Sequence, residues 1–191
     1  MNHQFRPFIL AALFSVLSLG SAPALSQETS WYAGLGLGQA SHDVECSGTT
    51  TCDDKDTAWK IFGGYQFNKN LGVEVGYTNL GEASLGDAVS TATFEVKGFE
   101  VLAVGTLPIN QQFDIYGKAG FFRWDLDVND NVFGSISESG TDLTFGIGAK
   151  YNFSKSLGIR LEWQRYNDIG NETTTGKSDS DFIGVGIVFK F

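Results

Sequence analysis

The sequence has few of the residues that catalysis and metal binding most often use. It holds two histidines, two cysteines and one methionine in 191 residues. His3 lies in the apolar N-terminal segment, so His42 is the only histidine of the remaining chain. Ser41 is adjacent to it, but neighbouring side chains in an extended strand point to opposite faces. We therefore expect no active site and no enzymatic activity.

Basic residues are also scarce. The chain carries 13 Lys and Arg against 22 Asp and Glu, a formal net charge of -9. Proteins bind nucleic-acid phosphates through clustered Lys and Arg, so a nucleic-acid partner is disfavoured. The glycine pattern Gly34-x-Gly36-x-Gly38 lacks the spacing of a nucleotide-binding loop and no helix is expected after it, so we expect no cofactor.

Long apolar runs are missing beyond the N-terminus. Residues 1–26 contain Arg6, an apolar stretch over residues 8–19 and small residues before Gln27, which together predict a signal peptide. No later apolar run approaches the roughly 18 residues of a transmembrane helix. A β-barrel remains possible, because each of its strands needs only about 9–11 alternating residues. We therefore expect residues 27–191 to form one exported domain.

The two cysteines, Cys46 and Cys52, are close together in a polar stretch. In an exported protein such a pair favours a disulfide, and closing so short a loop stiffens it modestly. A metal site is the weaker alternative, since no second cysteine pair or histidine cluster accompanies them.

Eight segments alternate apolar and polar residues with a period of two. They cover approximately residues 30–40, 57–67, 71–80, 93–107, 113–124, 141–153, 157–166 and 181–191. Short turns separate three pairs of these segments, whereas residues 41–56, 81–92, 125–140 and 167–180 are expected to be long polar loops. Short turns at one end and long loops at the other predict an all-β, eight-stranded antiparallel up-and-down transmembrane barrel with short periplasmic turns and four long extracellular loops.

Side-chain parity assigns the two faces of this barrel. Leu71, Val73 and Val75 share one face of their strand, opposite Gly72 and Glu74. The apolar face must contact lipid, because charges in hydrocarbon would cost several kcal/mol each. A soluble barrel would have the opposite arrangement, with apolar residues inside, and is disfavoured by the final Phe191, the signal peptide and the alternation of short turns and long loops. Aromatic residues gather at the strand ends, as expected for two interfacial belts.

One internal repeat relates two strands. Residues 65–74 resemble residues 151–160 at a constant offset, so Glu74 and Arg160 are expected at the same height. Their strands face each other across an eight-stranded barrel, and both side chains point inward. The interior of such a barrel is only wide enough for side chains to fill it. We therefore expect these two charges to meet, directly or through neighbours.

Several stretches resemble the family of transmembrane barrels typified by outer-membrane protein A. They are residues 72–77 (GVEVGY), 113–120 (FDIYGKAG) and 160–164 (RLEWQ), together with the final Phe191. The resemblance spans essentially the whole chain after the signal peptide. It implies an outer-membrane location, assembly by the barrel-assembly machinery through the C-terminal strand, and Phe191 as the assembly signal.

The resemblance also implies a charged cluster in the lumen, at Glu74, Lys118, Arg160 and Glu162. With the inward charges added from parity, we expect an ion-pair network formed by Glu74, Glu100, Lys118, Lys150, Arg160 and Glu162. The sequence departs from the family at Lys150, where an acid is usual, and at Val104, where a lysine is usual. Because the sequence ends at Phe191, we expect no peptidoglycan-binding domain.

Acidic residues concentrate in the predicted long loops. Asp125-x-Asp127-x-Asn129 begins like a calcium-binding loop, but Asp130 stands at the position of the required glycine. We therefore predict no specific metal site and leave looser divalent binding as an alternative. The acidic surface suits the divalent-rich lipopolysaccharide layer of an outer membrane.

These observations predict an integral outer-membrane protein with a structural and surface-interaction role. Its acidic loops lie outside the cell, where an unknown surface ligand would bind, and the ion-pair network plugs the lumen. The first alternative is a narrow gated ion channel. A more distant alternative is a barrel enzyme that modifies lipid A.

Overall fold

The computed structural model describes residues 30–42, 51–53, 55–86, 91–130, 134–171 and 176–191. The predicted signal peptide lies outside these residues and stays a prediction. Cys46 also lies outside them, and of Cys52 only its place in a short strand is described, so the disulfide stays a prediction as well.

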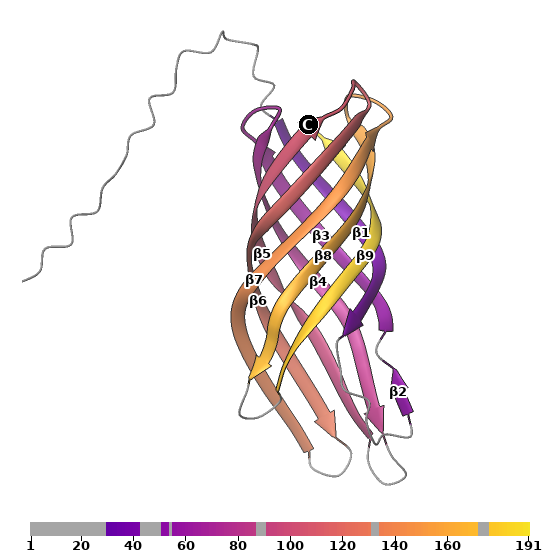
Figure 1. The fold of residues 1–191 in the computed structure, drawn as a ribbon, viewed down its shortest axis with the longest axis vertical. Coiled ribbons are helices and arrows are strands. Elements are labelled where there is room, and N and C mark those ends of the chain that lie inside the picture. The colour runs from indigo at the N-terminus through magenta and orange to yellow at the C-terminus, as the bar shows by residue number, and fades with distance from the viewer. Residues whose placement is uncertain (1–29, 43–50, 54, 87–90, 131–133, 172–175) are drawn as a thin grey trace, which may run out of the picture.

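The described chain consists of nine strands. They are β1 (Ser30–His42), β2 (Thr51–Asp53), β3 (Lys55–Gln66), β4 (Leu71–Gly86), β5 (Thr91–Pro108), β6 (Phe113–Asp130), β7 (Gly134–Asn152), β8 (Leu157–Asn171) and β9 (Gly176–Lys190). The long strands pair in the order β4-β3-β1-β9-β8-β7-β6-β5, and β4 also pairs with β5, which closes the sheet. The predicted eight-stranded antiparallel barrel is thus confirmed (Figure 1). The short β2 pairs with residues 84–86 at the end of β4, beyond the residues of β4 that pair with β3.

The three short turns, at the upper end in Figure 1, share one pattern of side-chain-to-backbone hydrogen bonds. The side-chain oxygens of Asn68, Asn110 and Ser154 each accept hydrogen bonds from the backbone N–H groups two and three residues ahead. Asn and Ser favour turns because their short side chains can satisfy backbone donors in this way. These residues therefore fix the ends of the β3–β4, β5–β6 and β7–β8 hairpins.

The strands are longer at the opposite end than the sequence predicts. Residues 81–86, 125–130, 134–140, 167–171 and 176–180 were expected in loops and instead belong to β4, β6, β7, β8 and β9. The period of two persists there: Leu126 is buried while Asp125 and Glu82 are exposed. The expectation was wrong because it took polar outward residues to mark a loop. Beyond the apolar belt, a strand can keep its pairing with polar residues on its outer face.

No helix in the described part of the chain is long and apolar enough to span a bilayer.

The barrel is apolar outside and mixed inside. Leu35, Leu161 and Phe121 are at least 60% exposed, whereas Lys60 and Glu74 are 1% exposed. This inversion of the soluble pattern confirms the predicted assignment of faces. Aromatic contacts band the outer surface at both ends of the belt. Trp31–Tyr65, Tyr65–Phe67 and Tyr151–Phe153 lie near the short turns, and Trp59–Tyr77, Tyr77–Phe99 and Phe145–Trp163 lie nearer the other end.

The interior has three levels along the barrel axis. The first level, called here the vestibule, opens at the short-turn end and is lined by residues of the turns and strand ends, among them Lys69, Lys150, Lys155 and Lys190. Next comes a level of charged side chains, called here the ion-pair layer: Lys60, Glu74, Glu100, Lys118, Arg160 and Glu162. Towards the long-strand end follows the apolar layer: Ala40, Ala58, Leu80, Val96, Phe122, Trp124, Leu126, Tyr166, Ile169 and Phe182.

Candidate functional site

The ion-pair layer balances three cations against three carboxylates. Its members come from five strands: Lys60 from β3, Glu74 from β4, Glu100 from β5, Lys118 from β6, and Arg160 and Glu162 from β8. None of the six is more than 5% exposed. A buried charge is tolerated only when partners compensate its lost hydration. A lumen filled with charged side chains is therefore stable only if the cations and the carboxylates balance.

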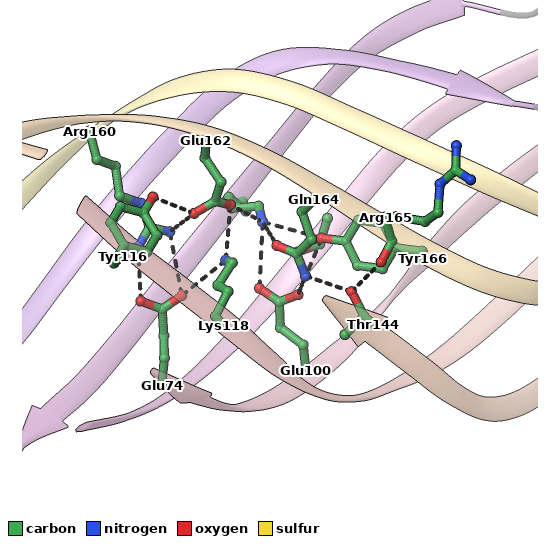
Figure 2. Close-up of polar contacts among 12 residues, drawn as sticks. Glu74, Glu100, Tyr116, Lys118, Thr144, Arg160, Glu162, Gln164, Arg165 and Tyr166 are labelled. Atoms are coloured by element: carbon green, nitrogen blue, oxygen red, sulfur yellow. Dashed lines mark hydrogen bonds and ion pairs between the residues drawn. The ribbon is translucent and has the colours of Figure 1, made fainter. Parts of the chain in front are cut away.

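Glu74 and Arg160 are in contact across the barrel. Arg160 Nη1 donates to Glu74 Oε2 at 2.8 Å, and Arg160 Nη2 donates to Glu74 Oε1 at 3.4 Å. In the closed sheet β4 and β8 are diametrically opposed, as the repeat predicts. The pair is therefore a strut that spans the lumen (Figure 2). Tyr32 OH also donates to Glu74 Oε2, at 3.2 Å.

Glu162, rather than the Glu74–Arg160 pair, is the hub of the layer. Its carboxylate lies 2.8 Å from Lys60 Nζ, 2.9 Å from Lys118 Nζ and 3.3 Å from Arg160 Nη2. Tyr116 OH also donates to it, at 2.9 Å. Glu74 and Arg160 meet, as the sequence predicts, but the carboxylate with the most cationic partners is that of Glu162. Adjacent inward positions on β8 place Glu162 between Arg160 and the lysines, which the comparison of Glu74 with Arg160 alone did not reveal.

Glu100 ends the layer on the side of the apolar layer. Its Oε2 accepts from Gln164 Nε2 at 2.8 Å and from Tyr166 OH at 3.2 Å. Its Oε1 lies 3.6 Å from Lys60 Nζ and has no hydrogen-bond donor among the described residues. Gln164 also donates to Thr144 Oγ1 at 2.8 Å, so neutral polar groups connect the charges to the wall (Figure 2).

Lys150 does not join this network. Its ammonium lies 3.2 Å from Asp114, its neighbour across the β6–β7 ladder, in a separate pair closer to the short turns. Its neighbour on the other side is Arg160, another cation. The third cation of the layer is instead Lys60. Lys60 alternates with the outward Trp59 and Ile61 on β3, so parity is consistent with its inward position, but the predicted network did not include it.

Glycines on β1 make room for the layer. A Cβ at Gly34 would overlap the ring of Phe62, and a Cβ at Gly36 would lie 2.9 Å from Lys60 Cγ. The space at Gly34 lets Phe62 lie against Arg160, whose guanidinium carbon is 3.4 Å from the ring centroid. The Gly34-x-Gly36 pattern is therefore a packing feature of the crowded lumen, as expected.

The apolar layer packs directly on the charges. Lys60 Nζ lies 4.7 Å from the Phe182 ring centroid, and the Phe122 and Tyr166 rings are 4.6 Å apart. Phe122, Tyr166 and Phe182 are at most 1% exposed. Tyr166 belongs to both levels, because its ring packs in the apolar layer while its hydroxyl reaches Glu100 and Lys60.

Beyond the aromatic band at the long-strand end, ion pairs lie on the outer surface. Lys97 contacts Asp127 at 3.0 Å and Glu95 at 3.2 Å. The hydrogen bond from Lys97 holds the pKa of Asp127 below its ordinary value, and the bonds to Asp127 and Glu95 raise the pKa of Lys97. Arg165 likewise contacts Asp181, at 2.5 Å.

The other predicted candidates fall in wall positions. His42 Nδ1 lies 2.8 Å from Ser180 Oγ, both buried, so its partner is not the adjacent Ser41. Asp125 and Asp127 lie on the strand β6 and not in a loop. Within the described ranges, no three His, Cys, Asp or Glu side chains are grouped to hold a metal ion. Phe191 is 81% exposed, and its N–H donates to Trp31 O at 2.9 Å.

Comparison with known proteins identifies the family of this chain. Residues 26–191 match the family described as OmpA-like transmembrane domain. The chain belongs to that family. Outer membrane protein A of Escherichia coli O157:H7 is 30% identical over 175 residues, which cover 89% of this chain and 50% of the relative. This OmpA-like chain thus spans about half the length of that relative.

Solved barrels share the fold at low sequence identity. Neisserial surface protein A superimposes with a TM-score of 0.67 at 18% identity, covering 85% of this chain and 99% of that one. Ail, the attachment invasion locus protein of Yersinia pestis, gives 0.53 at 18% identity, covering 84% and 99%. These structures share the barrel fold, and the match to the OmpA-like transmembrane domain together with the outer membrane protein A relative shows that the chain is a bacterial outer-membrane barrel. In such barrels the short turns face the periplasm, so the long-strand end faces outward from the cell.

Sequence reasoning missed the neutral members of the site. Tyr116, Gln164 and Tyr166 share the inward parity of the charges beside them on β6 and β8. They were not singled out because only charged side chains were taken as partners. Extending the parity to every polar inward residue would have found them.

Proposed function

We propose that this protein is a non-conducting scaffold that holds acidic segments at the cell surface. The observation that carries the proposal is the filled lumen. The ion-pair layer spans the barrel with side chains from five strands, and the apolar layer packs directly on it, with Lys60 Nζ 4.7 Å from the Phe182 ring centroid. An ion crossing the barrel would have to displace both, and the apolar layer offers it few polar groups in place of water.

The surface role rests on the charge of the outward end. The described acids there are Asp56, Glu82, Glu95, Asp125, Asp127, Glu138, Asp168, Asp179 and Asp181, against Lys55, Lys97, Arg123, Arg165 and Lys177. Such a surface repels polyanions and suits cations. The Ail structure contains a sulfated heparin analogue. We propose the opposite preference here, for lipopolysaccharide bridged by divalent cations and for basic surface partners.

A narrow gated channel is the second candidate. It is favoured by a small cavity of about 30 Å³ that reaches Glu74 and Arg160 from the periplasmic side. This cavity occupies only the periplasmic part of the barrel. Conduction would need concerted opening of both filled levels, so we place the channel second. We propose no catalytic role, since neither filled level presents a nucleophile–base pair at a cavity.

Ion flux from vesicles tests the proposal. The protein refolded into liposomes should release trapped potassium no faster than liposomes that contain a heat-inactivated sample. A general porin reconstituted at equal molar ratio provides the positive control. Potassium release comparable with the porin would contradict the scaffold proposal and favour the channel.

We also propose that Phe191 promotes assembly into the outer membrane. Its ring is exposed at the aromatic band near the short turns, and its N–H bonds to Trp31 of β1 at the end of the β9–β1 pairing. Removing Phe191 should reduce the folded outer-membrane yield far more than Lys190→Gln, the matched change at the preceding residue. Equal yields of heat-modifiable barrel for the two variants would contradict this role.

A further inference from the structure

The periplasmic mouth is the one part of the described barrel in which basic side chains dominate. Its charged side chains are Lys69, Lys150, Lys155 and Lys190 against Asp114. The whole chain has a net charge of -9, so composition alone would give this end an acidic surplus. The lysines therefore form a local feature that neither the scaffold role nor the ion-pair layer explains.

These side chains surround one space. The vestibule has a volume of about 910 Å³ and is lined by all four lysines. Lys69 and Lys155 lie on the β3–β4 and β7–β8 turns, which are diametrically opposed in the strand order. Lys150 and Lys190 line the wall and also the smaller cavity beneath it, which ends at Arg160. Positive charge thus lies at the rim and on the wall of the vestibule, next to the charge-balanced Glu74–Arg160 pair at its inner end.

Among the described residues, internal pairing leaves the charge of the two turn lysines uncompensated. Asp114 accepts from Lys150 and from Asn152 Nδ2, at 3.2 and 2.9 Å. Among the described residues, Lys69 and Lys155 make no ion pair, and both are exposed.

We propose that the vestibule binds a soluble anion that carries two or more phosphate groups. Ammonium groups bind phosphates as point charges, and several of them around one water-filled space favour a multivalent anion over a single one. Lys150 and Lys190 lie on the inner wall, which the head groups of the surrounding lipid do not reach. The site is therefore specific for a soluble phosphate compound and distinct from simple attraction of the rim to anionic lipid.

Inorganic tripolyphosphate is the probe for this site. The full chain refolded in nanodiscs of zwitterionic phosphatidylcholine should bind it with one-to-one stoichiometry in calorimetry, and more weakly as salt is raised. Both Lys150→Gln/Lys190→Gln and Lys69→Gln/Lys155→Gln should weaken binding at least tenfold. The matched control is Lys55→Gln/Lys177→Gln, which removes the same charge at the outward end and should change affinity less than twofold. The turn variant keeps the test valid if the wall variant does not fold.

Three results would overturn the proposal. They are no saturable binding of tripolyphosphate, equal weakening by the control variant, and unchanged binding in both vestibule variants. A second arm uses nanodiscs that contain phosphatidylglycerol. Enrichment of that lipid around the protein without tripolyphosphate binding would assign the lysines to lipid head groups and would also overturn the proposal. These experiments measure anion binding and not ion flux. A negative result would therefore overturn the anion site and leave the scaffold proposal unchanged.

Discussion

The ion-pair layer and the apolar layer fill adjacent lengths of the same barrel by different means. In the first, six charges compensate one another over distances of 2.8–3.6 Å. In the second, aromatic and aliphatic side chains exclude water by packing. The charged layer depends on every partner being present, because a lone buried charge is costly. The apolar layer depends mainly on volume, so it should tolerate changes of shape better.

This difference predicts opposite responses to similar substitutions. Removing one charge unbalances several partners, and the loss should be recovered by a compensating change elsewhere in the layer. Removing one ring leaves a cavity, and the loss should follow the volume removed. Four measurements sharpen the contrast, from the largest expected effect to the smallest.

Glu162→Ala should have the largest effect, because this carboxylate contacts three cations. We expect a loss of about 4–5 kcal/mol in the free energy of unfolding, at the upper end for a broken buried ion pair. Urea unfolding in lipid vesicles measures it. Glu95→Ala, which removes a partly exposed surface carboxylate, is the control and should cost less than about 1 kcal/mol. Equal losses would show that lumenal water screens the hub.

Phe122→Ala should cost about 3–4 kcal/mol, the usual range for truncating a buried aromatic residue. Phe122→Leu keeps more volume and should cost about 1–2 kcal/mol. Both losses should be insensitive to salt. The same urea experiment at low and high ionic strength checks this, and a cost that does not depend on the volume removed would argue against a packed apolar layer.

Arg160→Ala should cost about 2–3 kcal/mol, less than the hub change, because Lys118 still lies 3.4 Å from Glu74. Glu74→Gln should cost less again, since it preserves volume. Exchanging the two charges in Glu74→Arg/Arg160→Glu should recover much of the loss. A double variant that is as unstable as the sum of both single losses would show that the layer depends on position and not on charge balance.

Lys97→Gln tests the outer surface and should have the smallest effect, below about 1 kcal/mol. The lowered pKa of Asp127 stabilises the fold above the ordinary Asp value of about 3.9, and this contribution is lost as pH falls through the folded pKa. The difference in stability between wild type and Lys97→Gln should therefore shrink below about pH 4. Stability measured from pH 7 to pH 3 checks this. A difference that grows on acidification would contradict the assignment.

The sequence predicts the barrel better than its interior. Period-two alternation and turn residues identify strands such as β3 and β8 because each outward position must be apolar within the membrane. The same criterion fails beyond the aromatic bands, where β6 and β7 continue with polar outward residues. The partner of each lumenal charge depends on the height of its side chain along the barrel axis and on which side chain lies at that height on the opposite wall. The repeat supplied that information for Glu74 and Arg160, and no comparable signal placed Lys60 with Glu162 or Lys150 with Asp114.

Single-channel recording in planar bilayers tests most directly whether two filled levels close the lumen in series. Wild type, Arg160→Ala, Phe122→Ala and the combined variant should be compared at equal protein density. The account predicts no steady conductance for wild type, rare openings for either single variant, and frequent openings only when both levels are disrupted. Steady wild-type conductance, or a single Arg160→Ala variant that conducts as well as the combined variant, would contradict it.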